Sequence, residues 1–183
     1  MNTTQVKKVT KKVTALETLI KSSGVYKGTG TNLEKQEFKG MLTITPIATR
    51  NGVYIEYAAV GTAGTEYNND ANLYSLDTMY FHEEHTIVAK DNKNHLCMWT
   101  LSNVHPTMSL FKLRRMRHIP DEKTIMIFGF GTVEESSVFR EEISIEISEN
   151  GELVYTYSWG ESDGSYLSRH SARMNKVSKS FPL

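Results

Sequence analysis

The residues best able to do chemistry stand in the segment FHEEH, where two histidines enclose two glutamates. These four side chains, His82, Glu83, Glu84 and His85, are all of metal-ligating types. On a β-strand successive side chains point to opposite faces, so His82 pairs with Glu84 and Glu83 with His85. A closed zinc site needs about four ligands, whereas each face offers a single pair. We therefore interpret the segment as a solvated strand end, with a metal site as the less favoured alternative.

Another histidine, His170, lies near the C-terminus in the segment SYLSRHSARM. In an extended strand it shares one face with Tyr166, Ser168, Ala172 and Met174. The opposite face carries two arginines, so we predict that the less charged row faces inward. An inward imidazole could ligate a haem iron, hydrogen-bond a ligand, or be an ordinary core histidine. The sequence leaves these three roles open.

Aromatic residues recur on the strand that precedes this histidine. Tyr155, Tyr157 and Trp159 alternate in the segment LVYTYSW and share one face. Ligand cavities are lined mainly by aromatic groups with a few polar ones, although ordinary core packing gives the same pattern. The predicted ligand-binding residues are Tyr57, Trp99, Tyr155, Tyr157, Trp159, Tyr166 and His170.

Sequence signals for catalysis are weak. No Ser-His-Asp order and no nucleophile elbow are present. The pair Glu141-Glu142 is typical of a solvated face, and Cys97, within a strand pattern, is typical of an inert packing residue. We therefore predict no catalytic and no metal-binding residue. Enzymatic activity stays open, with a binding protein favoured.

Two kinds of element must position these residues. Residues 4–21 repeat apolar side chains every three or four positions, which predicts an amphipathic helix with one apolar face. That face comprises Val6, Val9, Val13, Leu16 and Ile20. We expect it to pack on the rest of the domain, since most such helices do. We predict two parts of the chain. Residues 1–22 carry the helix that packs on the barrel, and residues 23–183 form the barrel domain.

After Gly24 the apolar pattern changes to a period of two, which is typical of strands. The dipeptides Asn51-Gly52, Asn150-Gly151 and Asp163-Gly164 separate the runs and suit tight turns between antiparallel strands. We predict an all-β fold, a single antiparallel meander of about nine or ten strands closed into a barrel, because closure removes exposed edges. Residues 114–123 are predicted to form an irregular loop.

Three glycines in GVYKGTG, residues 24–30, raise the alternative of a nucleotide-binding loop. A dinucleotide loop follows a strand and opens a helix, whereas here a helix comes first. The glycine spacing also breaks at Leu33, and no Gly-Lys-Ser/Thr follows. Glycines at alternate strand positions instead allow a sharp bend or a close approach. We therefore predict a glycine-kinked first strand.

A helix that leads into Gly24, Tyr26, Gly28 and Gly30, followed by a meander, resembles the opening of calycin-type barrels. These are the lipocalin, fatty-acid-binding and nitrobindin-like families, which usually carry Trp where this chain has Tyr26. The resemblance implies a barrel that holds one small hydrophobic or amphipathic ligand. It also implies that Arg169 or Arg173 packs on the Tyr26 ring.

Nitrobindin-like proteins bind haem through a histidine near the C-terminus. We predict no cofactor for this chain, and the resemblance makes haem bound at His170 the alternative. A cavity enzyme that uses His170 is a further alternative. In a third alternative, the protein's own side chains fill the barrel core, and the domain acts as an interaction module for another macromolecule.

The net charge, the apolar runs and the cysteine count of the chain limit the classes of binding partner and the cellular compartment to be expected. Among 183 residues, 21 Lys and Arg balance 21 Asp and Glu, whereas nucleic-acid-binding proteins more often carry a basic surplus. No run of about 18 apolar residues could span a bilayer, and no signal core opens the chain. The single cysteine excludes an internal disulfide. We expect a cytoplasmic protein with a small-molecule ligand, without nucleic acid or stable membrane insertion, and with a homodimer as one open alternative.

Overall fold

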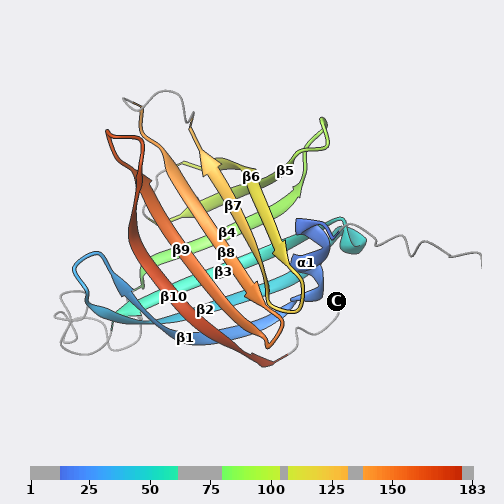
Figure 1. The fold of residues 1–183 in the computed structure, drawn as a ribbon, viewed down its shortest axis with the longest axis horizontal. Helices are drawn as coiled ribbons and strands as arrows, with labels where there is room; N and C mark the ends of the chain where they lie inside the picture. The colour runs from blue at the N-terminus through green and yellow to red at the C-terminus, as the bar shows by residue number, and fades with distance from the viewer. Residues whose placement is uncertain (1–12, 62–79, 104–106, 132–137, 179–183) are drawn as a thin grey trace, which may run out of the picture.

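A computed structural model of the chain describes residues 13–61, 80–103, 107–131 and 138–178 (Figure 1). The elements are α1 (Ala15–Lys21), β1 (Gly24–Asn32), β2 (Glu37–Ile47), the 3₁₀ turn η1 (Ala48–Arg50), β3 (Gly52–Gly61), β4 (Tyr80–Lys90), β5 (Leu96–Ser102), β6 (Ser109–Ile119), β7 (Lys123–Phe130), β8 (Glu141–Ser148), β9 (Glu152–Gly160) and β10 (Tyr166–Ser178).

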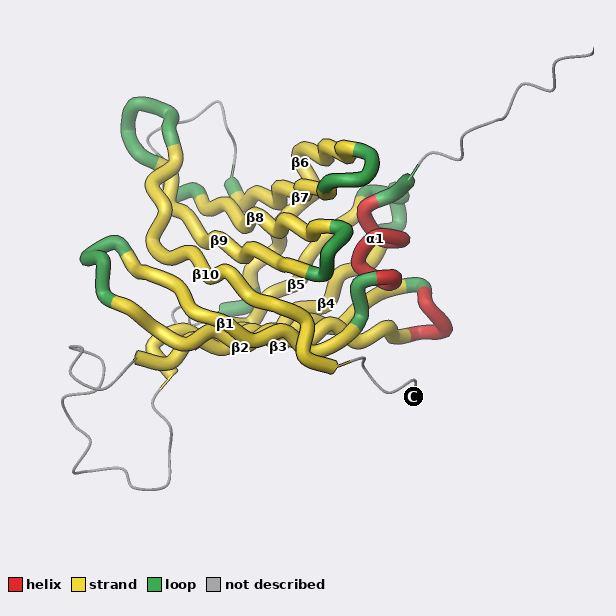
Figure 2. The backbone as a smooth tube through the Cα atoms, turned by 60° about the horizontal axis from the view of Figure 1, so that its bottom comes forward, coloured by secondary structure: helices red, strands yellow, loops and turns green. Residues whose placement is uncertain are grey.

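The strands form a closed ten-stranded barrel in which every neighbouring pair is antiparallel. Each strand lies beside its neighbours in the chain, and β1 closes the barrel by pairing with β10, with Gly28 opposite Met174. The predicted meander barrel is therefore confirmed. Helix α1 lies at one end, and the β1–β2 and β9–β10 turns lie at the opposite end (Figure 2).

The glycines of the first strand make room for close neighbours. A Cβ atom on Gly28 would lie 2.0 Å from the carbonyl oxygen of Arg173, on the adjacent strand β10. A Cβ atom on Gly30 would lie 2.3 Å from Cζ of the Phe38 ring, which fills the barrel interior at that point. The glycine-rich segment is therefore part of the barrel wall, and the nucleotide-loop alternative is wrong.

The predicted loop at residues 114–123 is wrong, because most of it belongs to β6 and to the start of β7. A β-bulge between Leu113 and Arg115 inserts one extra residue into β6. Since a bulge leaves one residue out of the ladder, Arg114 and Arg115 can follow each other without either entering the core. Beyond the bulge, Met116 packs against the core again.

Helix α1 is shorter than predicted and begins at Ala15. Thr14 caps it, because its side chain accepts a hydrogen bond from the Glu17 backbone while the Glu17 carboxylate accepts one from the Thr14 backbone. Ala15 and Leu19 are buried against the core, whereas Leu16 and Ile20 are only partly buried. The buried face of the helix is therefore turned about the helix axis from the predicted one, and it is centred on Ala15 and Leu19 rather than on Leu16 and Ile20. Residues 6 and 9 lie outside the described residues.

Replacing Thr14 by alanine should lower the free energy of unfolding by about 1 kcal/mol, because it removes the cap of a seven-residue helix. Urea denaturation followed by circular dichroism measures the change. The control is Thr18→Ala within the same helix, which should stay within about 0.5 kcal/mol. Equal losses in the two variants would contradict a capping role for Thr14.

Tyr26 lies where the resemblance predicts the conserved aromatic residue, buried beside α1 with its hydroxyl donating to the Ser22 carbonyl at 2.5 Å. The cation over its ring is Lys176, whose Nζ is 5.7 Å from the ring centre. Arg169 lies over Trp159 instead, and Arg173 pairs with Glu152. Neither predicted arginine packs on Tyr26.

Candidate functional site

A cluster of polar and aromatic side chains fills part of the barrel interior. Its members come from β3, β4, β9 and β10 and are Tyr57, His82, Glu84, Tyr155, Tyr157 and His170. All six are inward-facing residues with at most 4% of their surface exposed. Strands β3 and β9 lie on different sides of the closed sheet, so the side chains meet across the interior. We call this set the interior cluster.

Aromatic rings pack around His170 at the centre of the interior cluster. Tyr57 and Tyr157 stack on the imidazole with ring centres 5.6 and 5.5 Å away. The Tyr57 hydroxyl lies 3.4 Å from His170 Nδ1. The His82 ring approaches to 4.5 Å, and Phe38 packs edge-on at 5.9 Å. His170 therefore faces inward, as its row predicts.

A carboxylate connects the two sides of the interior cluster. His82 Nε2 lies 2.9 Å from Glu84 Oε1, and the Tyr155 hydroxyl donates a short hydrogen bond to Glu84 Oε2. Glu84 thereby links β4 to β9, which are far apart in the sequence. Because buried polar groups are costly unless paired, Glu84 offsets part of the cost of burying His82 and Tyr155.

A second carboxylate, Glu141 at the start of β8, accepts a short hydrogen bond from the Tyr157 hydroxyl. Trp159 Nε1 donates to the same tyrosine oxygen at 2.9 Å. Trp159 is half-buried and carries Phe139 against one side and the Arg169 guanidinium over its ring. This set extends the interior cluster toward the end of the barrel opposite α1.

The environment fixes the protonation of several members. Burial, helped by repulsion from His82, holds the pKa of His170 well below its usual value. Burial and the Glu84 carboxylate raise the pKa of Tyr155 well above normal. Burial and the hydrogen bond to Glu141 likewise raise the pKa of Tyr157. At neutral pH the site therefore offers a neutral imidazole and protonated tyrosine hydroxyls.

Stability should fall as the pH drops below about 6.5, the unperturbed value for histidine. The unfolded chain binds a proton at His170 there, while the folded state keeps the imidazole neutral because its pKa is lowered. The contribution of this one group is a slope of up to about 1.4 kcal/mol per pH unit, lost on acidification. Urea unfolding at about pH 7.5 and 5.5 measures the slope. A His170→Asn variant with the slope of the unmodified chain would contradict this assignment.

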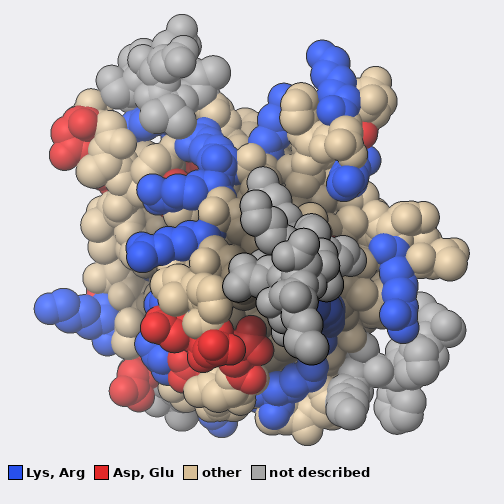
Figure 3. Space-filling model, turned by 45° about the vertical axis from the view of Figure 1, so that its right-hand side comes forward, with Lys and Arg blue, Asp and Glu red and all other residues tan. Residues whose placement is uncertain are grey.

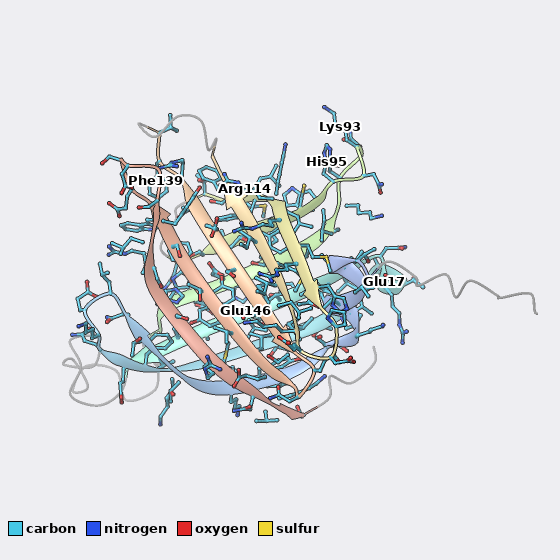
Figure 4. All side chains as sticks on the ribbon, in the orientation of Figure 1. Glu17, Lys93, His95, Arg114, Phe139 and Glu146 are labelled. Carbon is cyan, nitrogen blue, oxygen red and sulfur yellow. The ribbon has the colours of Figure 1, made fainter. Side chains whose placement is uncertain are left out.

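Four of the seven predicted ligand-binding residues, Tyr57, Tyr155, Tyr157 and His170, lie in the interior cluster, and Trp159 borders it. Tyr166 lies apart, because the bulge between Ser168 and His170 shifts the alternation of β10. Its hydroxyl accepts a 2.6 Å hydrogen bond from Arg114 Nη1, and Arg140 packs on its ring. Figure 4 shows Arg114 and Phe139 near the end of the barrel where the β9–β10 turn projects.

Trp99 lies on the outer face of the barrel, apart from the other predicted residues. Its neighbours in the strand, Met98 and Thr100, are the ones that face inward and are buried. No clear alternation of apolar and polar residues is visible in this strand, because both of its faces are largely apolar.

Sequence reasoning missed His82, Glu84 and Glu141. The interpretation of FHEEH as a solvated strand end is wrong for His82 and Glu84, which are 2% and 3% exposed. Glu141 is fully buried, so its assignment to a solvated face is also wrong. A signal existed for Glu141, since it shares the alternation of Ile143 and the later isoleucines of β8.

A groove of about 710 Å³ lies at the α1 end, between the helix, the β6–β7 and β8–β9 turns and the end of β10. Val13, Tyr26 and Lys176 are among its lining residues. The Tyr26 hydroxyl and the Lys176 ammonium are already engaged there, as described above. No residue predicted to bind a ligand lines this groove.

Within the described ranges, no three His, Cys, Asp or Glu side chains come together as a metal site. None of the helices in that part of the chain has the length and apolar character needed to cross a membrane.

Comparison with known proteins bears on the fold. No family model and no curated protein matches the sequence. Among solved structures, the crystal structure of Rv2717c from M. tuberculosis superposes with a TM-score of 0.63 at 11% sequence identity. The match covers 90% of this chain and 98% of that one. At this identity the similarity shows the fold alone, a closed antiparallel barrel consistent with the calycin-like architecture.

Proposed function

We propose that the barrel binds one small, largely apolar molecule with a single polar end, at the interior cluster. The observation that carries the proposal is the buried network of Glu84 with His82 and Tyr155. A barrel of this size could fill its core with apolar side chains. Buried ionisable groups cost stability, so their presence in the core favours a functional role. Their position among aromatic rings is typical of a ligand site.

The orientation of the ligand follows from the chemistry of the cluster. The Tyr157 hydroxyl donates to Glu141 and accepts from Trp159, and its second lone pair can accept from the polar end. The His82 ring lies beside the Tyr157 ring, with ring centres 5.1 Å apart. Tyr157 and half-buried Trp159 supply an aromatic surface for the apolar body. The ligand therefore lies on the side of the cluster toward the end opposite α1.

Haem is the alternative that the resemblance implies, and the ring packing tests its fit. A neutral histidine is the form that ligates iron, and the lowered pKa of His170 meets that requirement. However, Tyr57 and Tyr157 both stack on the imidazole, the Tyr57 hydroxyl lies 3.4 Å from Nδ1, and the centre of the His82 ring is 4.5 Å away. A macrocycle coordinated by His170 would have to displace these rings. The arrangement does not fit haem, and a smaller ligand is favoured.

Native mass spectrometry of gently purified protein tests the proposal first. We expect a mass increment from one retained molecule above the 20.8 kDa chain. Rebinding of that molecule, or binding of a naphthalene-sulfonate dye, is then followed by Trp159 fluorescence in a Trp99→Phe background. A Soret band after haem addition, lost in His170→Ala, would instead establish the haem alternative.

Tyr157→Phe should weaken binding about tenfold, because it removes one hydroxyl while leaving the ring in place. The matched control is Tyr54→Phe on the outer face of β3, where the hydroxyl bonds to His85 at 2.6 Å. That variant should bind as the unmodified chain does. If no molecule is retained and the dye does not respond, the barrel is filled and the proposal is wrong.

A further inference from the structure

The outer face of strands β4, β5 and β6 carries large apolar side chains in one contiguous group. Ile87, Trp99 and Leu110 are direct cross-strand neighbours, and Leu101 lies two residues along β5 from Trp99. Leu101, Ile87 and Leu110 are 48%, 44% and 40% exposed, and Trp99 is half-buried. We call these four residues the outer apolar face. Contiguous apolar surface of this kind marks an interaction site, whereas single exposed apolar residues do not.

The outer apolar face is not part of the barrel core. The alternate residues of the same strands, such as Val88 and Met98, already supply the core and are buried. Tyr54 on β3 extends the row by one strand, because it pairs with Ile87. Strands about 4.8 Å apart make such a four-strand row about 15–20 Å wide. With a charged border, that width suits an interface of standard size, about 800 Å² per partner.

Charges border the outer apolar face asymmetrically. On the β3–β4 side stand Glu56 and Glu83, whose side chains are 50% and 41% exposed. On the β6 side stand the exposed cations Lys112, Arg115 and Arg117. In the view of Figure 3, which labels no residue, Lys and Arg side chains spread over much of the visible surface and Asp and Glu side chains gather mainly at the lower left. One flank of the outer apolar face is thus acidic and the other basic.

We propose that the outer apolar face is a homodimer interface whose occupant is a second copy of this chain. In a twofold dimer the same patch meets itself. Glu56 and Lys112 lie on opposite sides of the cross-strand row through Trp99, each two residues along its own strand from that row. If the twofold axis lies in the interface diagonally to the strands, the Glu56 corner of one copy faces the Lys112 corner of its partner. The acidic flank of each copy then meets the basic flank of the other, so both pairs of flanks attract. A lipid surface fits less well, because an anionic membrane would attract only the basic flank and repel the flank that carries Glu56 and Glu83, whereas a second copy complements both flanks.

Sedimentation velocity between about 1 and 100 µM, where interfaces of this size commonly associate, tests the proposal. We expect the unmodified chain to sediment at twice the 20.8 kDa monomer mass. Leu110→Glu should give monomers, since it buries a charge in the interface. The matched control is Leu167→Glu on β10, which is also 40% exposed but lies outside the outer apolar face and should leave the dimer intact. Circular dichroism confirms that each variant is folded.

A charge-reversal pair separates this arrangement from other apolar association. Lys112→Glu should weaken the dimer at least tenfold, and adding Glu56→Lys should recover most of the loss. A monomeric unmodified chain at the highest concentration would overturn the proposal, as would a dimer that Leu110→Glu leaves unchanged. A monomer that sediments with anionic phospholipid vesicles would assign the face to a membrane and overturn it too.

Discussion

Replacing Glu84 by alanine should lower the free energy of unfolding by about 3 kcal/mol. The substitution removes the acceptor of the Tyr155 hydroxyl and the anion beside His82 Nε2, and both partners stay buried. Neither group can reach water, so each keeps the cost of burial and loses its compensation. Urea denaturation at neutral pH measures the change.

The neighbouring residue provides the control. Glu83 points to the opposite face of β4, where its carboxylate lies 3.3 Å from His85 Nε2 and is partly exposed. Glu83→Ala should change stability by no more than about 0.5 kcal/mol, because an exposed pair contributes little. If both alanine variants lost the same stability, the buried network would have no special energetic role.

A combined substitution tests whether the buried network serves stability or ligand binding. His82→Leu, Glu84→Leu and Tyr155→Phe together replace its polar groups by apolar side chains of similar size. Since well-packed apolar residues often equal or exceed a buried ion pair in stability, this variant should recover most of the loss caused by Glu84→Ala. It should also lose binding of the retained molecule. Recovered stability with unchanged binding would mean that the network has no role in ligand recognition.

The barrel was predictable because its signals are local. Alternation of apolar and polar residues is visible within each strand, and the Asn150-Gly151 and Asp163-Gly164 turns carry the positive φ angles that such dipeptides allow, 88° at Gly151 and 90° at Gly164. Inward rows on β9 and β3 followed from the same alternation. The start of α1 could also have been predicted, since Thr14 and Glu17 have the spacing of a capping box.

The polar half of the interior cluster was not predictable in this way. The partner of buried Glu84, Tyr155, is 71 residues away in the sequence, and Tyr57 and His170 are 113 residues apart. Only the closed barrel brings these pairs together, so a local pattern treats a glutamate as solvated. The bulge in β10 is a similar case, because one extra residue moved Tyr166 out of the row of His170 without a sequence signal.

Leu19→Ala should cost about 2–5 kcal/mol, the range for truncating a fully buried leucine. Helix α1 has seven residues, too few to persist in water alone, so its packing on β2 and β3 must hold it in place. Leu16→Ala is the matched comparison and should cost less, since Leu16 is only partly buried. Urea unfolding gives both values, and amide hydrogen exchange across residues 15–21 should speed up selectively in Leu19→Ala. If Leu16→Ala proved the more damaging, the helix would present the face that the sequence periodicity predicts, and the packing described for Leu19 would be wrong.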